Sequence, residues 1–215
     1  MTHIEAPGRS SPPELLVLHS VRIQGMADDD AVAVRFGLDE AETREILLDD
    51  EAYGWIRQAA FGGTAGWSMT ERGRAEDDRR LAEELADAGA RPVVERVHEA
   101  FGPLNTRLLA ACTDWQVRPE GGNRLTPNPH TDPEWDARVL AELDALDDGL
   151  APLVTELASA LARFEGYDTR FSAALARARS GRGEWVTGTG IGSCHVVWME
   201  LHEDLVSTLG VQRGA

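Results

Sequence analysis

The amino-acid sequence predicts a mainly α-helical fold with one short β-hairpin. Apolar residues recur at helical spacing through most of the 215-residue chain, and capping residues and glycines bound these segments. A strand–turn–strand pattern interrupts the helices between residues 53 and 69. The order helix, helix, helix, hairpin, helix over residues 11–88 is that of a winged helix-turn-helix. We therefore expect a winged-helix domain in residues 1–90 and a helical ligand or dimerisation domain in residues 91–215.

Three capped helices are expected first. Ser11 can cap a helix that begins with two prolines and stops near Gly25. A second short helix ends at Gly37, a residue type that favours the left-handed end of a helix. Asp39 caps the third helix, in which isoleucine and leucine supply an apolar side.

The hairpin and a long helix complete the first domain. Tyr53–Phe61 is the first expected strand, Gly62–Gly66 the turn and Trp67–Met69 the second strand. Thr70 then caps a charged helix that runs to about Ala88.

The remainder of the sequence predicts further helices. Pro92 opens a helical segment that Gly102–Pro103 interrupts. Ser193 caps a final helix through Leu209. Between them we expect three helices, near residues 133–147, 150–165 and 168–180, and two loops, over 117–133 and 181–192.

Composition and charge exclude several classes of function. The chain has 21 basic and 37 acidic residues, a net charge of −16, which argues against non-specific nucleic-acid binding and against an anionic membrane surface. Neither a membrane span nor a secretory signal is expected, because no apolar run is long enough. With two cysteines, the expected location is a reducing cytoplasm.

Four short stretches resemble one family. Gly66–Arg74 is similar to the second wing strand and the capped helix of MarR-like transcriptional regulators, and Gly54–Arg57 to the end of their recognition helix. Thr113–Gln116 and His195–Leu205 are similar to stretches in actinobacterial proteins of that kind. The resemblance implies a homodimer that binds operator DNA and responds to a small ligand.

Five residues of the first domain are the expected DNA contacts. They are Thr43, Arg44, Arg57, Arg72 and Arg74. The third helix, however, carries seven carboxylates between Asp39 and Glu51 against the single Arg44, and such a density of negative charge repels phosphate and base edges.

The second domain carries the expected ligand site. His195 and His202 lie seven residues apart on the last helix, so both fall on one stripe with Trp198. The stripe suits either a pocket wall or a core of hydrogen-bonded histidines, and Trp115 is a further candidate for the pocket. The expected ligand-binding residues are therefore Trp115, His195, Trp198 and His202.

Two other groups have simpler structural interpretations. The run from His130 to Asp136 could hold a metal ion, but Asp132 as a helix cap with Pro133 in the first turn explains it better. Cys112 and Cys194 lie on apolar stripes, and we expect them to be buried and inert.

The sequence favours a ligand-responsive MarR-like regulator, with operator DNA and a small molecule as partners. One alternative is a winged-helix protein that has lost DNA binding and acts as an enzyme or small-molecule-binding protein through the helical pocket. Another is a protein-interaction module. No catalytic motif, cofactor or metal site is identified.

Overall fold

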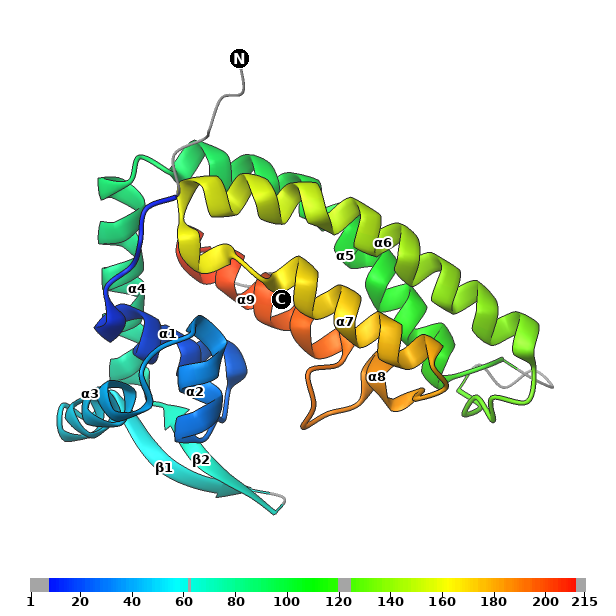
Figure 1. Ribbon diagram of the computed structural model, residues 1–215, viewed down its shortest axis with the longest axis horizontal. Coiled ribbons are helices and arrows are strands. Elements are labelled where there is room, and N and C mark those ends of the chain that lie inside the picture. The colour runs from blue at the N-terminus through cyan, green and yellow to red at the C-terminus, as the bar shows by residue number, and fades with distance from the viewer. Residues whose placement is uncertain (1–7, 62, 120–124, 212–215) are drawn as a thin grey trace. The chain divides into compact units, whose positions relative to one another are not determined.

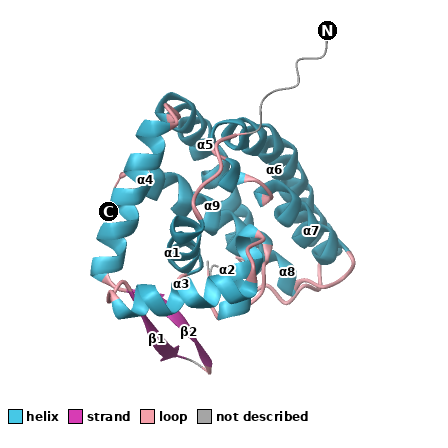
Figure 2. Cartoon of the chain, turned by 60° about the vertical axis from the view of Figure 1, so that its left-hand side comes forward, coloured by secondary structure: helices cyan, strands magenta, loops and turns pink. Residues whose placement is uncertain are grey.

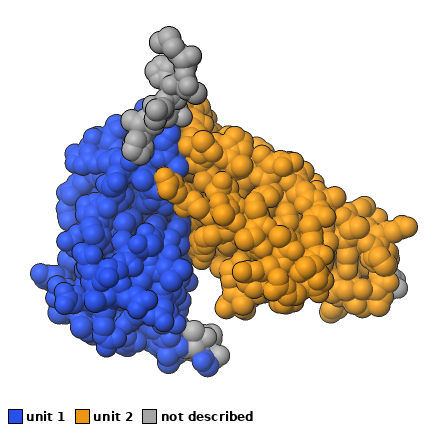
Figure 3. Space-filling view, in the orientation of Figure 1, with its two compact units in different colours: residues 1–94, 158–163, 202–215 blue, residues 95–157, 164–201 orange. Residues whose placement is uncertain are grey.

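The computed structural model describes residues 8–61, 63–119 and 125–211. The chain forms two compact units: unit 1 comprises residues 1–94, 158–163 and 202–215, and unit 2 comprises residues 95–157 and 164–201 (Figure 3). The first break, after Val94, lies close to the expected boundary at residue 90, but two later segments belong to unit 1.

The described chain is mainly helical, as expected, with one two-stranded antiparallel sheet (Figures 1 and 2). None of its helices in the described ranges is long and apolar enough to cross a bilayer. In order, the elements are α1 (Pro13–Gln24), α2 (Asp29–Phe36), α3 (Glu40–Ala52), β1 (Ile56–Phe61), β2 (Thr64–Met69), α4 (Glu71–Asp87), α5 (Arg91–Gln116), α6 (Pro133–Ala160), the short 3-10 turn η1 (Ala162–Phe164), α7 (Tyr167–Arg179), α8 (Glu184–Thr187) and α9 (Cys194–Leu209).

Local capping explains where the helices of unit 1 begin. The Asp39 carboxylate accepts hydrogen bonds from two backbone N–H groups of α3, and Thr70 Oγ1 accepts one from Gly73, so both predicted caps are confirmed. Gly37 ends α2 in the left-handed conformation, also as predicted. Ser11 is a correction: its hydroxyl donates to Glu84 on α4, and α1 starts without a side-chain cap.

The hairpin turn is shorter than predicted. β2 begins at Thr64, and Ala59 pairs with Gly66 in the sheet, so Gly66 is a strand residue and not part of the turn. A Cβ at Gly66 would lie 2.6 Å from the backbone oxygen of Ala27, where the chain before α2 bridges to β2. Glycine is required there by close approach of two backbones.

The core of unit 1 joins the hairpin to the first three helices. Eight buried apolar side chains form one cluster: Val17, Leu18, Val21, Ala27, Val32, Leu47, Ile56 and Trp67. Residues from all of these elements are needed to remove this surface from water.

Two predicted helix breaks in unit 2 are wrong. Helix α5 runs through Pro103, and α6 runs through Pro152, so the expected helices near 133–147 and 150–165 are one helix. A proline removes one intrahelical hydrogen bond, and long helices packed on apolar neighbours can absorb that loss. The predicted glycine-rich loop contains the one-turn helix α8, and Ser193 caps α9 as expected.

Candidate ligand site in unit 2

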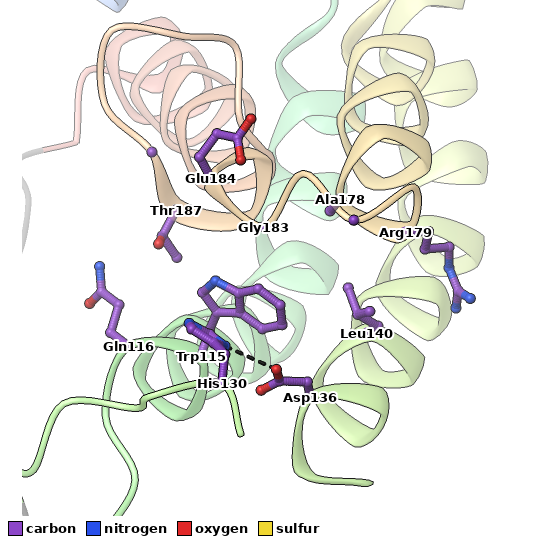
Figure 4. Close-up of a pocket in the computed structure, with 12 residues that line it drawn as sticks. Trp115, Gln116, His130, Asp136, Leu140, Ala178, Arg179, Gly183, Glu184 and Thr187 are labelled. Carbon is purple, nitrogen blue, oxygen red and sulfur yellow. Dashed lines mark hydrogen bonds and ion pairs between the residues drawn. The ribbon is translucent and has the colours of Figure 1, made fainter. Parts of the chain in front are cut away.

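A cavity of about 620 Å³ lies between α5, α6, α7 and α8, entirely within unit 2 (Figure 4). This volume falls in the range of sites for small organic ligands. It is lined by Trp115 and Gln116 at the end of α5, by His130 before α6, by Asp136 and Leu140 of α6, and by residues between Ala178 and Gly188.

The wall that carries His130 is fixed by the chain's return after α5. The backbone N–H of Asn128 donates to Gln116 O, and the Asn128 side chain donates to Trp115 O. Asp132 caps α6 through the N–H groups of Glu134 and Trp135, which confirms the predicted cap. The cap places Asp136 in the first turn of the helix.

His130 sits in an uncommon backbone conformation. Its φ of 54° is the only positive value among the described residues other than glycine. The side-chain oxygen of Asn128 accepts the His130 backbone N–H at 3.1 Å, which holds this conformation. Residues in sparsely populated backbone conformations cluster at binding sites, so this conformation marks the His130 side chain as a candidate ligand contact.

The His130 ring is held by one nitrogen. Nδ1 lies 3.0 Å from Asp136 Oδ2, and the ring packs against Trp115 with centroids 4.5 Å apart. Asn128 donates its two amide hydrogens to Trp115 O and Asp136 Oδ1, so neither is donated to His130 Nδ1. The ionised Asp136 carboxylate can only accept a hydrogen bond, and the hydrogen between it and the ring is therefore carried by Nδ1. Neutral His130 therefore keeps Nε2 as a hydrogen-bond acceptor.

Several polar groups of the cavity have no protein partner within the described part of the chain. They are His130 Nε2, Trp115 Nε1, the Gln116 amide, the Thr187 hydroxyl and the Glu184 carboxylate. Arg179, by contrast, is paired with Asp144. A cavity lined by polar groups that have no protein partner can bind a ligand through hydrogen bonds to these groups.

Glycine is needed on the facing wall. A Cβ at Gly183 would lie 3.0 Å from the six-membered ring of Trp115. A Cβ at Gly188 would lie 2.4 Å from Glu184 O. Gly183 thus lets the start of α8 approach the indole closely, and Gly188 lets the chain leave α8 close to the helix backbone.

The four predicted ligand residues do not converge. Trp115 lines the cavity, but Trp198 is fully buried, stacks on Phe101 at 4.8 Å and donates to Asn105. His195 is half-buried in unit 2, where burial lowers its pKa, and His202 belongs to unit 1. The helical stripe is real, but Trp198 is a core residue.

His130 and Asp136 are the site residues that sequence reasoning did not select. The capping interpretation explains Asp132 but gives no role to the side chains of His130 and Asp136. A signal was present in the sequence, since His130 lies just before a capped helix whose first turn offers a carboxylate. The role of Asn128 in fixing the ring could not be read from spacing.

Metal and thiol chemistry find no site here. In the described ranges no three His, Cys, Asp or Glu residues are placed to hold a metal ion. Cys112 and Cys194 are buried, as predicted, and burial raises the pKa of each thiol to about 12, which keeps both protonated.

The expected DNA contacts of unit 1 differ in exposure. Thr43 is 1% exposed, so its side chain cannot reach DNA, which corrects that expectation. Arg44 is exposed but pairs with Asp29 at 2.8 Å. Arg57 on β1 and Arg72 on α4 are exposed, and Arg74 lies 3.5 Å from Glu203.

The outer face of α3 is acidic. Besides Arg44, its exposed charged side chains are Glu40, Glu42, Glu45, Asp49 and Glu51. Asp50 points inward, and burial raises its pKa to about 7.

A second histidine in unit 1, His19, is fully buried between two carboxylates. Nδ1 lies 3.2 Å from Asp77 Oδ2 and Nε2 lies 3.1 Å from Asp204 Oδ1, the latter contact being too oblique for a good hydrogen bond. Burial lowers the pKa of His19, but Asp77 and Asp204 outweigh it and raise the pKa to about 8. His19 is thus positively charged at neutral pH.

Arg163 and Arg22 also belong to this network. Arg163 donates to Glu84 at 2.8 Å, to Thr208 at 2.7 Å and to Asp204. Arg22 donates to Asp77 at 2.9 Å. Every contact lies within unit 1, and the groups are enclosed, so the network is structural.

Compared with known proteins, the chain matches no family model, no curated protein and no solved structure.

Proposed function

We propose that this chain is a ligand-responsive regulatory protein whose small-molecule site is the cavity of unit 2. The observation that carries the proposal is the convergence of partnerless polar groups on one cavity, with His130 held in a positive-φ conformation by Asn128. Trp115 is buried, yet its indole N–H has no partner among the described residues, whereas buried polar groups normally have one. Polar groups that face a cavity without a protein partner can form hydrogen bonds with a ligand.

For unit 1 we propose a winged helix-turn-helix of the MarR-like kind that acts on operator DNA as a homodimer. The order α1, α2, α3, hairpin, α4 supports this proposal. Because the outer face of α3 is acidic, we expect DNA contact through Arg57 on the hairpin and Arg72 at the start of α4. Binding of the small molecule is then expected to change the affinity for DNA.

A compound screen read by the melting temperature tests the ligand site. Leu140→Trp places a large side chain in the cavity, and Ala141→Trp is a matched control on the exposed side of the same helix. We expect compounds that raise the melting temperature of the wild type and of Ala141→Trp but not of Leu140→Trp. Compounds that stabilise Leu140→Trp equally would remove the cavity from the proposal.

A gel shift with the protein's own upstream region tests the regulator. Arg57→Ala is expected to weaken binding to all sequences equally and to lower the salt slope by about one, because Arg57 would meet phosphate. Arg107→Ala, in unit 2, is the charge-matched control. A blank gel at low salt with the wild type would refute DNA binding.

Sedimentation tests the homodimer. We expect a species of twice 23.4 kDa at micromolar concentration. A single species of 23.4 kDa would contradict it.

A second candidate is a protein-interaction module, which the acidic face of α3 favours. In that case the partner is a basic protein surface. Replacing Glu45 and Asp49 by Gln would weaken that complex and leave the small-molecule response unchanged.

A further inference from the structure

Two groups of the cavity in unit 2 form a complementary donor and acceptor. His130 Nε2 is an acceptor, because the hydrogen of the neutral ring is committed to Asp136 through Nδ1. Trp115 Nε1–H can only donate, and it has no partner within the described residues. Figure 4 places the indole nitrogen and the second ring nitrogen of His130 on the same side, away from Asp136.

A cyclic amide has the matching edge. Its N–H and C=O are cis and adjacent, so one ligand edge offers a donor to His130 and an acceptor to Trp115. A ligand with an acceptor alone would leave His130 Nε2 unmatched, and a ligand with a donor alone would leave the indole N–H unmatched. Each unmatched group in a desolvated site costs binding free energy.

The charges of the cavity disfavour an anionic ligand. Asp136 and Glu184 line it, while Arg179, the arginine among its described lining residues, is already paired with Asp144. An anion would be repelled by the two carboxylates. A cation would be attracted by these carboxylates, but a cationic donor alone would leave the indole N–H without an acceptor.

We propose that the cavity binds a neutral cyclic amide, with His130 Nε2 accepting from the ligand N–H and Trp115 Nε1–H donating to the ligand C=O. The proposal rests on the proposed function, since it names the ligand class of the same cavity. Asp136 and Asn128 act as positioning residues that set the tautomer and the direction of the His130 ring.

Two bicyclic probes test it: 2-quinolone, which has the cyclic amide edge, and N-methyl-2-quinolone, which lacks the N–H. Binding is followed in ¹⁵N-labelled protein by the indole signals of the six tryptophans, of which Trp115→Phe identifies that of Trp115. We expect 2-quinolone to shift the Trp115 indole signal with saturation. The N-methyl compound is expected to bind about tenfold more weakly, because the acceptor on His130 stays unmatched.

A variant of His130 sharpens the test. His130→Asn suits the positive φ, since asparagine tolerates the left-handed region, but its side chain is too short to place an acceptor where Nε2 lies. We expect the variant to lose the discrimination between the two probes. Trp135→Phe is the matched control: its indole N–H is already bound to Asp114 O, and it lies outside this cavity, so discrimination is retained.

Two outcomes overturn the inference in different ways. If both probes shift the Trp115 signal with equal affinity, the cyclic-amide assignment fails and the cavity remains a ligand site. If neither probe shifts that signal, the assignment also fails, and the compound screen with Leu140→Trp decides separately whether the cavity binds a ligand.

Discussion

Two histidine–carboxylate arrangements in this chain use the same chemistry in opposite ways. His19 in unit 1 is fully buried and has a carboxylate beside each ring nitrogen, Asp77 and Asp204. His130 in unit 2 has a carboxylate beside one nitrogen only, and its side chain is 42% exposed at a cavity. The first arrangement leaves no atom for a ligand, and the second leaves Nε2.

The difference shows why a histidine beside a carboxylate does not by itself indicate function. For His19 the carboxylates compensate a buried positive charge, and removing one would leave that charge unpaired. For His130 the carboxylate sets the tautomer of a ring that is open to solvent. The two roles differ in how deeply the histidine ring is buried and in how many of its nitrogens lie beside a carboxylate.

The largest effect is expected from removing the later segments of unit 1. A fragment of residues 1–94 lacks Arg163 and Asp204, so His19 loses one of its two carboxylates and Glu84 loses its contact with Arg163. We expect no cooperative urea transition by circular dichroism, whereas the full chain unfolds cooperatively. A cooperative fragment would break the comparison, because the His19 site would then form without Asp204.

Single substitutions of the two carboxylates should differ strongly. Asp204→Asn leaves His19 and Arg163 buried without a full counter-charge, and we expect a loss of about 3–5 kcal/mol of unfolding free energy in urea. Asp136→Asn changes a partly exposed pair and should cost about 1 kcal/mol or less. Equal losses would contradict the division into a structural and an open pair.

The smallest expected effect is the pH dependence of stability. The pKa of His19 is raised from 6.5 to about 8, so the folded state holds a proton that the unfolded state releases. The stabilisation is complete below the unfolded pKa and is lost as pH rises through 8. We expect the free energy of unfolding to fall by about 1 kcal/mol between pH 7 and 9 from His19, and Asp50, whose pKa is raised to about 7, adds a fall of the same sign at the lower end of this range.

The control for the pH experiment is a direct titration of His19 by NMR. A stability that stays flat or rises between pH 7 and 9 would mean that the buried ring is neutral. In that case the network would be a set of neutral hydrogen bonds around His19, unlike the charged one described above.

Local signals predicted most of the helices, because capping acts within a few residues of the chain. Asp39, Thr70 and Ser193 each mark a helix start in the sequence, and each accepts the expected backbone hydrogen bond. Prediction failed where the role of a residue depends on contacts with a part of the chain that is distant in sequence. Gly66 was assigned to the turn, although its need for glycine comes from Ala27.

The geometry of the two histidine sites depends on facts that residue spacing does not give. The charge partners of His19 lie 58 and 185 residues further along the chain, at Asp77 and Asp204. No periodic pattern links such positions. At His130 the decisive facts are a backbone angle and an amide orientation, and neither leaves a mark in residue spacing.

The return of the chain end to unit 1 has a consequence for synthesis on the ribosome. Unit 1 receives Asp204 and Thr208 only after residues 95–201 have been translated. Until then the nascent segment that contains His19 and Asp77 lacks the carboxylate of Asp204, so its buried network of charges is incomplete. Unit 1, although its first segment precedes unit 2 in sequence, is therefore expected to complete its folding only after the residues of unit 2 have been translated.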